Sequence, residues 1–126
     1  MIVSVTLVAL GGAIGAALRY LTGLGLVRTF GYQDFPIAII TVNVIGSFLM
    51  GAFVAAAAHR GLTHYSPFVM TGLLGGFTTF SAFSLETVNL IERGAFGQAT
   101  LYMALSVGLS IGALMLGLVA TRGVLI

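Results

Sequence analysis

The chain has 126 residues, of which 59% are hydrophobic and only 6% are charged. A soluble domain carries roughly 25% charged residues, so this composition indicates an integral membrane protein. The absence of cysteine excludes disulfides and thiolate metal sites, and five arginines with a formal net charge of +2 form no basic patch for nucleic acid.

Four apolar segments follow one another along the chain, and each exceeds the roughly 20 residues that a membrane-spanning helix needs. They cover residues 2–27, 36–58, 67–91 and 98–121. The second and third open with Pro36 and Pro67, which suit a first helical turn. We therefore expect an all-α membrane protein with a single four-helix transmembrane domain over residues 1–126, in which short loops make neighbouring helices antiparallel.

Glycines lie inside these segments as well as between them. Three groups of them resemble small-residue faces, namely Gly11, Gly12 and Gly15, then Gly46 and Gly51, then Gly108, Gly112 and Gly117. Small-residue faces let helix backbones approach closely in lipid, where the hydrophobic effect does not drive helix association. These faces predict a tight bundle or dimer and carry no information about a transported substrate.

The arginines near the segment ends are divided equally between the two sides of the membrane. With both termini on one side, that side carries Arg60 and Arg122, and the other side carries Arg28 and Arg93. Because arginine bias sets membrane orientation, this balance predicts dual topology, in which copies insert both ways and pair as an antiparallel homodimer. The alternative is a single orientation set by lipid or by the first helix.

The third segment contains the most informative stretch, GGFTTFSAFS at residues 75–84. Backbone groups at membrane depth must be paired internally, so this glycine- and hydroxyl-rich stretch predicts a broken helix that lines a water-filled cavity or an ion site. Phe80 and Phe83 share one helical face, where their ring edges could help to hold an anion, although phenylalanine in a membrane helix is ordinarily core or lipid-facing. Carbonyls released by a break near Gly75 and Gly76 would instead suit sodium.

Polar side chains also lie within the other segments. Arg19 either faces an aqueous vestibule, where it would attract anions, or extends to the membrane interface. Asn43 either bonds across a helix interface or lines a path, where its amide would offer two donors. Ser106 and Ser110 share a face with Tyr102 one turn earlier, which suggests a hydroxyl track, although such serines usually bond back to their own backbone.

Over essentially its whole length the chain resembles the Fluc (CrcB-type) family of bacterial fluoride channels. The resemblance rests on GGAIGAALRY at residues 11–20, VNVIGSF at residues 42–48 and, above all, residues 75–84. It implies an antiparallel dual-topology homodimer with two narrow pores in the bacterial inner membrane. The implied role is passive export of cytoplasmic fluoride, with no enzymatic chemistry.

The resemblance also implies the site residues. The fluoride path would be lined by Asn43, Phe80, Ser81, Phe83, Tyr102, Ser106 and Ser110, with Arg19 near the vestibule. Backbone carbonyls of Gly75 and Thr78, from both subunits, would hold a central structural sodium ion. One position departs from the family pattern, because Ile39 stands four residues before Asn43, where the family often has a hydroxyl.

Two other functions fit part of the sequence. A small proton-coupled exporter of cationic drugs would share the size and dual topology, and would use Glu86, the only carboxylate deep in a predicted span. The chain lacks tryptophan, which helps such exporters to bind large cations. A non-transporting accessory subunit held by its glycine faces would leave residues 75–84 unexplained.

Overall fold

The computed structural model describes residues 1–31 and 35–125. Its elements in chain order are α1 (Ile2–Phe30), α2 (Ile37–Arg60), η1 (Thr63–Tyr65), η2 (Pro67–Leu74), α3 (Gly75–Phe77), α4 (Ser81–Glu92) and α5 (Phe96–Leu125). Within the described residues, four helical segments are long and apolar enough to cross a membrane, and the third of them, Thr63–Glu92, combines η1, η2, α3 and α4. The prediction of an all-α protein with four membrane spans is confirmed.

All four segments continue past the ends expected from hydropathy. The reason is that apolarity marks the depth of the membrane, whereas the helix ends where the backbone turns. Glycines with positive φ follow α1, α2 and α4 closely, at Gly31 (φ 77°), Gly61 (φ 70°) and Gly94 (φ 76°). Such left-handed positions favour glycine and commonly end helices, so the polar residues just outside the lipid remain helical.

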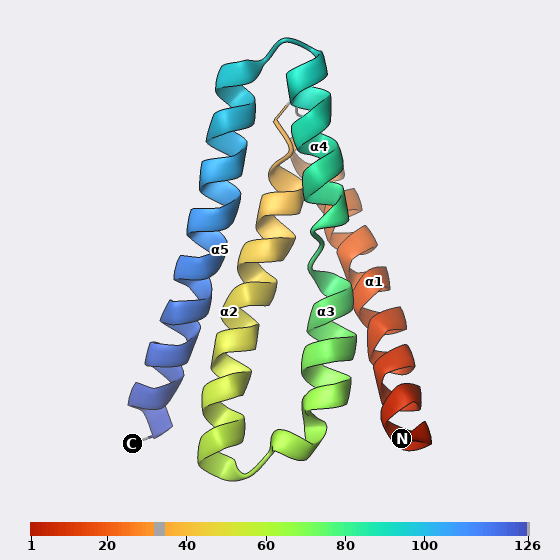
Figure 1. Ribbon diagram of the computed structural model, residues 1–126, viewed down its shortest axis with the longest axis vertical. Helices are drawn as coiled ribbons and strands as arrows, with labels where there is room; N and C mark the ends of the chain where they lie inside the picture. The colour runs from red at the N-terminus through yellow and green to blue at the C-terminus, as the bar shows by residue number, and fades with distance from the viewer. Residues whose placement is uncertain (32–34, 126) are drawn as a thin grey trace.

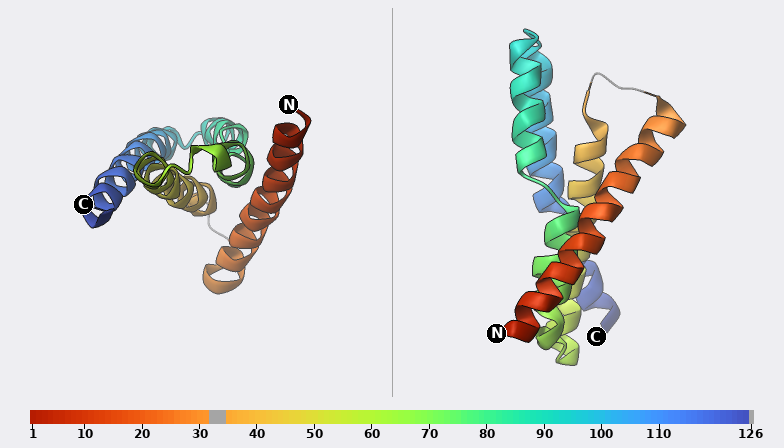
Figure 2. Two further views of the ribbon diagram at one scale, coloured as in Figure 1. Left: turned by 90° about the horizontal axis from the view of Figure 1, so that it is seen from below. Right: turned by 90° about the vertical axis from the view of Figure 1, so that its right-hand side faces the viewer.

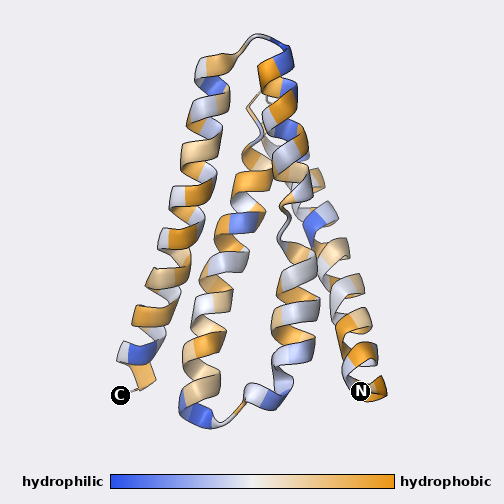
Figure 3. Ribbon diagram, viewed as in Figure 1, coloured by the Kyte–Doolittle hydropathy of each residue, from blue (hydrophilic) through white to orange (hydrophobic). Residues whose placement is uncertain are grey.

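The spans run alternately up and down, so the two termini lie at the same end of the molecule (Figure 1). α2 packs along α5, α1 packs along η2 and α3, and α4 packs against α5. The view along the molecule places α1 and α5 on opposite sides (Figure 2). Hydrophilic residues gather at the helix ends, with a few exceptions inside the spans (Figure 3).

Glycines bring two helix pairs into backbone contact. A β-carbon on Gly15 of α1 would collide with the carbonyl oxygen of Leu73, and one on Gly76 would lie 2.7 Å from the carbonyl oxygen of Gly12. Gly51 and Gly117 allow α2 and α5 to approach in the same way. Gly108 and Gly112 would meet no atom within 4 Å, so only part of the predicted face on the fourth span is used within the chain.

The third span is broken, but not at the glycines. Its first half is the π-helix η2, and Gly75 and Gly76 remain helical in α3. The backbone becomes extended at Thr78 (φ −82°, ψ 160°), and α4 begins at Ser81. The expected break near Gly75 and Gly76 is therefore wrong by a few residues. Gly76 is needed for the close approach to α1, whereas the helix opens where side chains can replace its lost backbone bonds.

Candidate functional site

Asn43 of α2 forms hydrogen bonds to the backbone at the break in the third span. Its Oδ1 accepts a hydrogen bond from the Thr79 N–H at 2.8 Å, and its Nδ2 donates to the Thr79 carbonyl at 3.0 Å. Thr79 is only 8% exposed, so these backbone groups would otherwise lack partners. The two bonds make Asn43 a clamp across 36 residues of sequence, and they occupy one of the two amide N–H donors expected to be available to an anion.

The break also releases carbonyl oxygens from their helical donors, and two of the diverted N–H donors have side-chain partners instead. In a continuous α-helix the Thr79 N–H would donate to the Gly75 carbonyl, but it donates to Asn43. The Ala82 N–H would donate to the Thr78 carbonyl, but it donates to Thr79 Oγ1 at 3.1 Å. The Gly75 and Thr78 carbonyls named from the sequence are therefore among the carbonyls whose α-helical donors are diverted. Carbonyl oxygens released in this way are the ligand type that a hard cation such as sodium takes.

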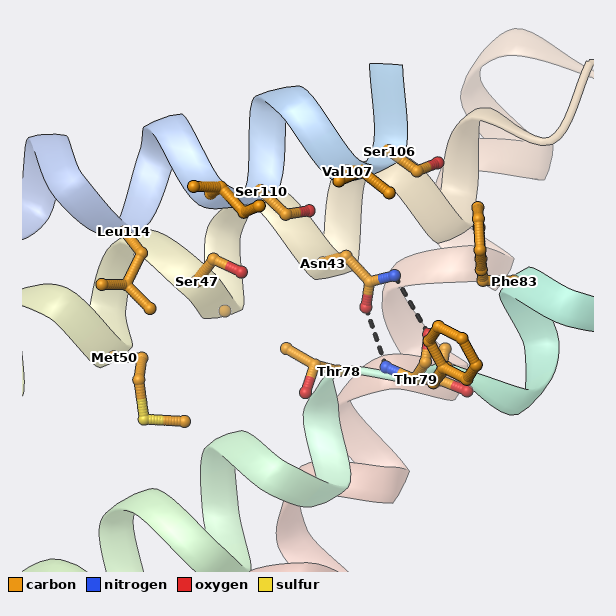
Figure 4. Close-up of a pocket in the computed structure, with 13 residues that line it drawn as sticks. Asn43, Ser47, Met50, Thr78, Thr79, Phe83, Ser106, Val107, Ser110 and Leu114 are labelled. Carbon is orange, nitrogen blue, oxygen red and sulfur yellow. Dashed lines mark hydrogen bonds between the residues drawn. The ribbon is translucent and has the colours of Figure 1, made fainter. Parts of the chain in front are cut away.

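A cavity of about 350 Å³ lies between α2, the break and α5 (Figure 4). Its polar lining consists of Asn43, Ser47, Thr78, Thr79, Ser106 and Ser110. Apolar side chains complete the wall, among them Met50, Phe80, Phe83, Ile111 and Leu114. The cavity thus brings together residues from three spans that the sequence could only place separately.

Aromatic rings continue from the cavity into the core. Phe80 and Phe83 lie with ring centroids 5.5 Å apart, and Phe83 lies 5.3 Å from Tyr102. Phe35 meets Tyr102 edge-on at 5.7 Å. Phe80 is 76% exposed although it lines the cavity, whereas Tyr102 is fully buried. The row therefore begins on an open surface of the chain and ends inside it.

The predicted hydroxyl track is only partly exposed to the cavity. Ser106 and Ser110 line it, but Tyr102 does not, because its ring is covered by Phe35 and Phe83. Within the described residues, the buried Tyr102 hydroxyl and the buried Ser106 Oγ have no hydrogen-bond partner. Two uncommitted hydroxyls at membrane depth are unusual, and they point to a ligand or to a surface that completes the site.

Other predicted residues lie away from this cavity. Arg19, Ser81 and Gly75 do not line it; Arg19 is partly buried on α1, and Ser81 Oγ lies 3.3 Å from Thr79 Oγ1. Ile39, which stands in place of the family's hydroxyl, packs against the cluster formed by Tyr102, Leu90 and Ala99. An apolar side chain at this position cannot offer the Tyr102 hydroxyl a partner.

Glu86 faces a different pocket. This second cavity, of about 220 Å³, lies between the end of α1 and the beginning of α2, and its described lining includes Leu26, Val27 and Ile39. Within the described residues no arginine forms an ion pair with Glu86. The carboxylate lies against mostly apolar surface.

Two of the polar residues that line the cavity were not identified from the sequence. Ser47 follows Asn43 by one helical turn, so the two residues share a helical face and both line the cavity. This spacing is visible in the sequence, but there Ser47 was assigned to a glycine face that packs against another helix. Thr79 provides the backbone that Asn43 clamps and the hydroxyl that caps α4. No sequence signal pairs it with a residue in another span.

Comparisons with known proteins agree with this architecture. Residues 6–118 match the model of the family described as "CrcB-like protein, Camphor Resistance (CrcB)". A protein of Ruegeria sp. (strain TM1040) named "Fluoride-specific ion channel FluC" is 66% identical over 125 residues, which cover 99% of each chain. Proteins of the same name from Roseobacter denitrificans and Caulobacter vibrioides are 68% and 50% identical, over 96% and 94% of this chain. The resemblance seen in the sequence is confirmed, and the chain belongs to the CrcB family of membrane proteins.

Proposed function

We propose that this multi-pass membrane protein is a fluoride-selective channel that passively exports cytoplasmic fluoride across the bacterial inner membrane. The observation that carries the proposal is the cavity beside the broken span, which is lined by uncommitted hydroxyls, an amide and two phenylalanine rings. The name shared by the relatives at 50–68% identity supports fluoride as the ion. Passage of an anion needs no covalent step, so the proposed activity is not enzymatic.

The lining matches the chemistry of the ion. Fluoride is small and strongly hydrated, and it can only accept hydrogen bonds, so a selective path must replace its water with donors. Ser106 and Ser110 offer hydroxyls, and Asn43 retains one N–H beyond its bond to Thr79. The ring edges of Phe80 and Phe83 carry partial positive charge and would contribute weaker contacts. Among the described residues, no charged side chain lines the cavity. A full positive charge there would hold the anion too tightly to release it.

The dimer forms part of the same proposal. Phe80 is 76% exposed on the open side of the cavity, and a second copy would cover it and close the path. Arg60 and Arg122 belong to the end that holds the termini, whereas Arg28 and Arg93 belong to the opposite end, as the charge count requires for dual topology. Two antiparallel copies would provide two such paths.

Sodium would be held where the third span opens. The Gly75 and Thr78 carbonyls, diverted from their helical donors, would face their counterparts in the antiparallel copy. When bound there, the ion would supply the charge that neutralises four converging carbonyl dipoles. This chain contributes the extended backbone at Thr78 and the bonds from Asn43 and Thr79 that keep those carbonyls out of the helix.

The test is anion efflux from liposomes that contain the purified protein, followed with fluoride- and chloride-selective electrodes. We expect fast fluoride release without chloride release, and its loss in Phe80→Leu and Asn43→Leu. Phe96→Leu is the matched control, because Phe96 is 65% exposed but does not line the cavity. If a well-folded wild-type protein releases no fluoride, the proposed function is wrong.

Orientation and sodium have separate tests. A C-terminal reporter should be detected on both sides of the membrane, and detection on one side alone would rule out dual topology. Thermal unfolding in detergent should occur at higher temperature in sodium than in an equal concentration of a bulky organic cation. Equal unfolding temperatures in the two salts would argue against a structural sodium.

A further inference from the structure

We propose that Ser47 of α2 and Ser110 of α5 together form a further fluoride-coordinating position, at the end of the cavity away from Phe83. The proposal deepens the fluoride path and rests on the proposed function. Only the structure identifies Ser47 as a candidate residue of the fluoride path, because it lines the cavity one turn beyond Asn43. Figure 4 shows Ser47 and Ser110 on α2 and α5, with Phe83 on the far side of Asn43.

The hydroxyls that lie within the spans differ in their hydrogen bonding. One group donates to the carbonyl four residues earlier in its own helix, at 2.8–3.1 Å, and its members include Thr41, Thr78, Ser84 and Thr87. This is the usual arrangement for serine and threonine in membrane helices. Within the described residues, Ser47, Ser106 and Ser110 make no such bond, and all three line the same cavity. Their O–H groups are free to donate to a ligand.

The spacing places these donors on two facing columns. Asn43 and Ser47 are four residues apart on α2, and Ser106 and Ser110 are four apart on α5, so each pair lies on one helical face. Gly51 and Gly117 hold the two helices at backbone contact next to this region. Ser47 and Ser110 thus offer one donor each from opposite helices to the same space, which a small anion can bridge.

The polar columns end at the same level. One turn further, the cavity wall is formed by Met50 on α2 and Leu114 on α5, which offer no donors. Ser47 and Ser110 would therefore be the last hydrogen-bonding position at this end of the cavity. A single remaining hydroxyl at such a position replaces less of the hydration shell, so loss of Ser47 should weaken fluoride entry more than it alters the fold.

The test compares fluoride efflux from liposomes across a range of fluoride concentrations for wild type, Ser47→Ala, Ser47→Thr and Thr41→Val. For Ser47→Ala we expect roughly a tenfold lower flux at low fluoride and a higher half-saturating concentration, because one hydrogen bond to a charged group contributes about that factor. Ser47→Thr keeps the hydroxyl and should conduct close to wild type. Thr41→Val is the matched control, since its hydroxyl is bonded within α2 and does not line the cavity.

The outcomes separate this inference from the proposed function. If wild type conducts fluoride and Ser47→Ala matches it at every concentration, Ser47 is not a fluoride ligand although the channel stands. If Ser47→Thr loses as much fluoride flux as Ser47→Ala, the effect is one of packing and the inference is overturned. The same holds if Thr41→Val loses as much flux as Ser47→Ala. If Ser47→Ala does not fold, Ser47→Cys can replace it, because cysteine has nearly the size of serine but a weaker donor. Ser47→Cys should give a fluoride flux between those of wild type and a variant without a donor. A flux equal to that of wild type would overturn the inference.

Discussion

Replacing Asn43 with leucine should open the third span, because it removes both bonds that clamp Thr79. Leucine keeps the branching and the number of side-chain heavy atoms of asparagine, so the change removes the polar contacts without emptying the site. A buried N–H or C=O left without a partner costs about 1–3 kcal/mol, and Thr79, at 8% exposure, would have one of each. The two together predict a loss of about 2–6 kcal/mol in the free energy of unfolding.

The measurement is equilibrium unfolding in mixed micelles with increasing dodecyl sulfate, followed by far-ultraviolet circular dichroism because the chain has no tryptophan. Hydrogen bonds in membrane bundles average about 0.6 kcal/mol by double-mutant cycles, so two bonds set a lower limit near 1 kcal/mol. Thr41→Val is the control on the same helix and should change stability by less than about 0.5 kcal/mol. A loss below about 1 kcal/mol for Asn43→Leu would refute the clamp.

Asn43→Asp separates the clamp from the ion path. The carboxylate can still accept the bond from the Thr79 N–H, but it cannot donate to the Thr79 carbonyl. Stability should therefore also fall, because the Thr79 carbonyl loses its donor and faces a carboxylate oxygen. The added negative charge at the cavity should reduce fluoride flux severely. If Asn43→Asp and Asn43→Leu lose flux only in proportion to stability, Asn43 acts solely as a clamp.

Three further predictions follow from particular contacts. Gly15→Ala should destabilise the protein by about 1–3 kcal/mol because its β-carbon meets the Leu73 carbonyl, whereas Gly23→Ala, in open space, should not; similar unfolding curves for the two would contradict the packing. Tyr102→Phe should keep wild-type stability, since the Tyr102 hydroxyl has no partner within the described residues, and any loss of fluoride flux would then assign that hydroxyl to the ion. Glu86→Gln should leave fluoride efflux in place, measured in liposomes without a proton gradient; abolished flux with proton-coupled uptake of organic cations in wild type would favour the exporter.

Much of the fold follows from local sequence. Hydropathy located the four helical segments that could cross a membrane, the family motifs named several of the residues that line the cavity, and the charge balance led to the prediction of dual topology. Helix ends were less certain, because the polar residues after Val27 continue α1 until Gly31 permits the left-handed turn. The break was expected from residues 75–84, but its position among them depended on partners elsewhere in the chain.

What the sequence determined by itself is the class of protein, since composition and segment length depend on each residue's own affinity for lipid. Only the tertiary structure decided where the third span opens, because the Thr79 backbone leaves the helix where Asn43, on another span, can replace its bonds. The tertiary structure also decided which hydroxyls lack a hydrogen-bond partner within the described residues. Ser47 becomes a candidate fluoride ligand only because α2 and α5 face each other across the cavity. Hydrogen bonds at membrane depth must be satisfied between spans, and linear order does not show which spans meet.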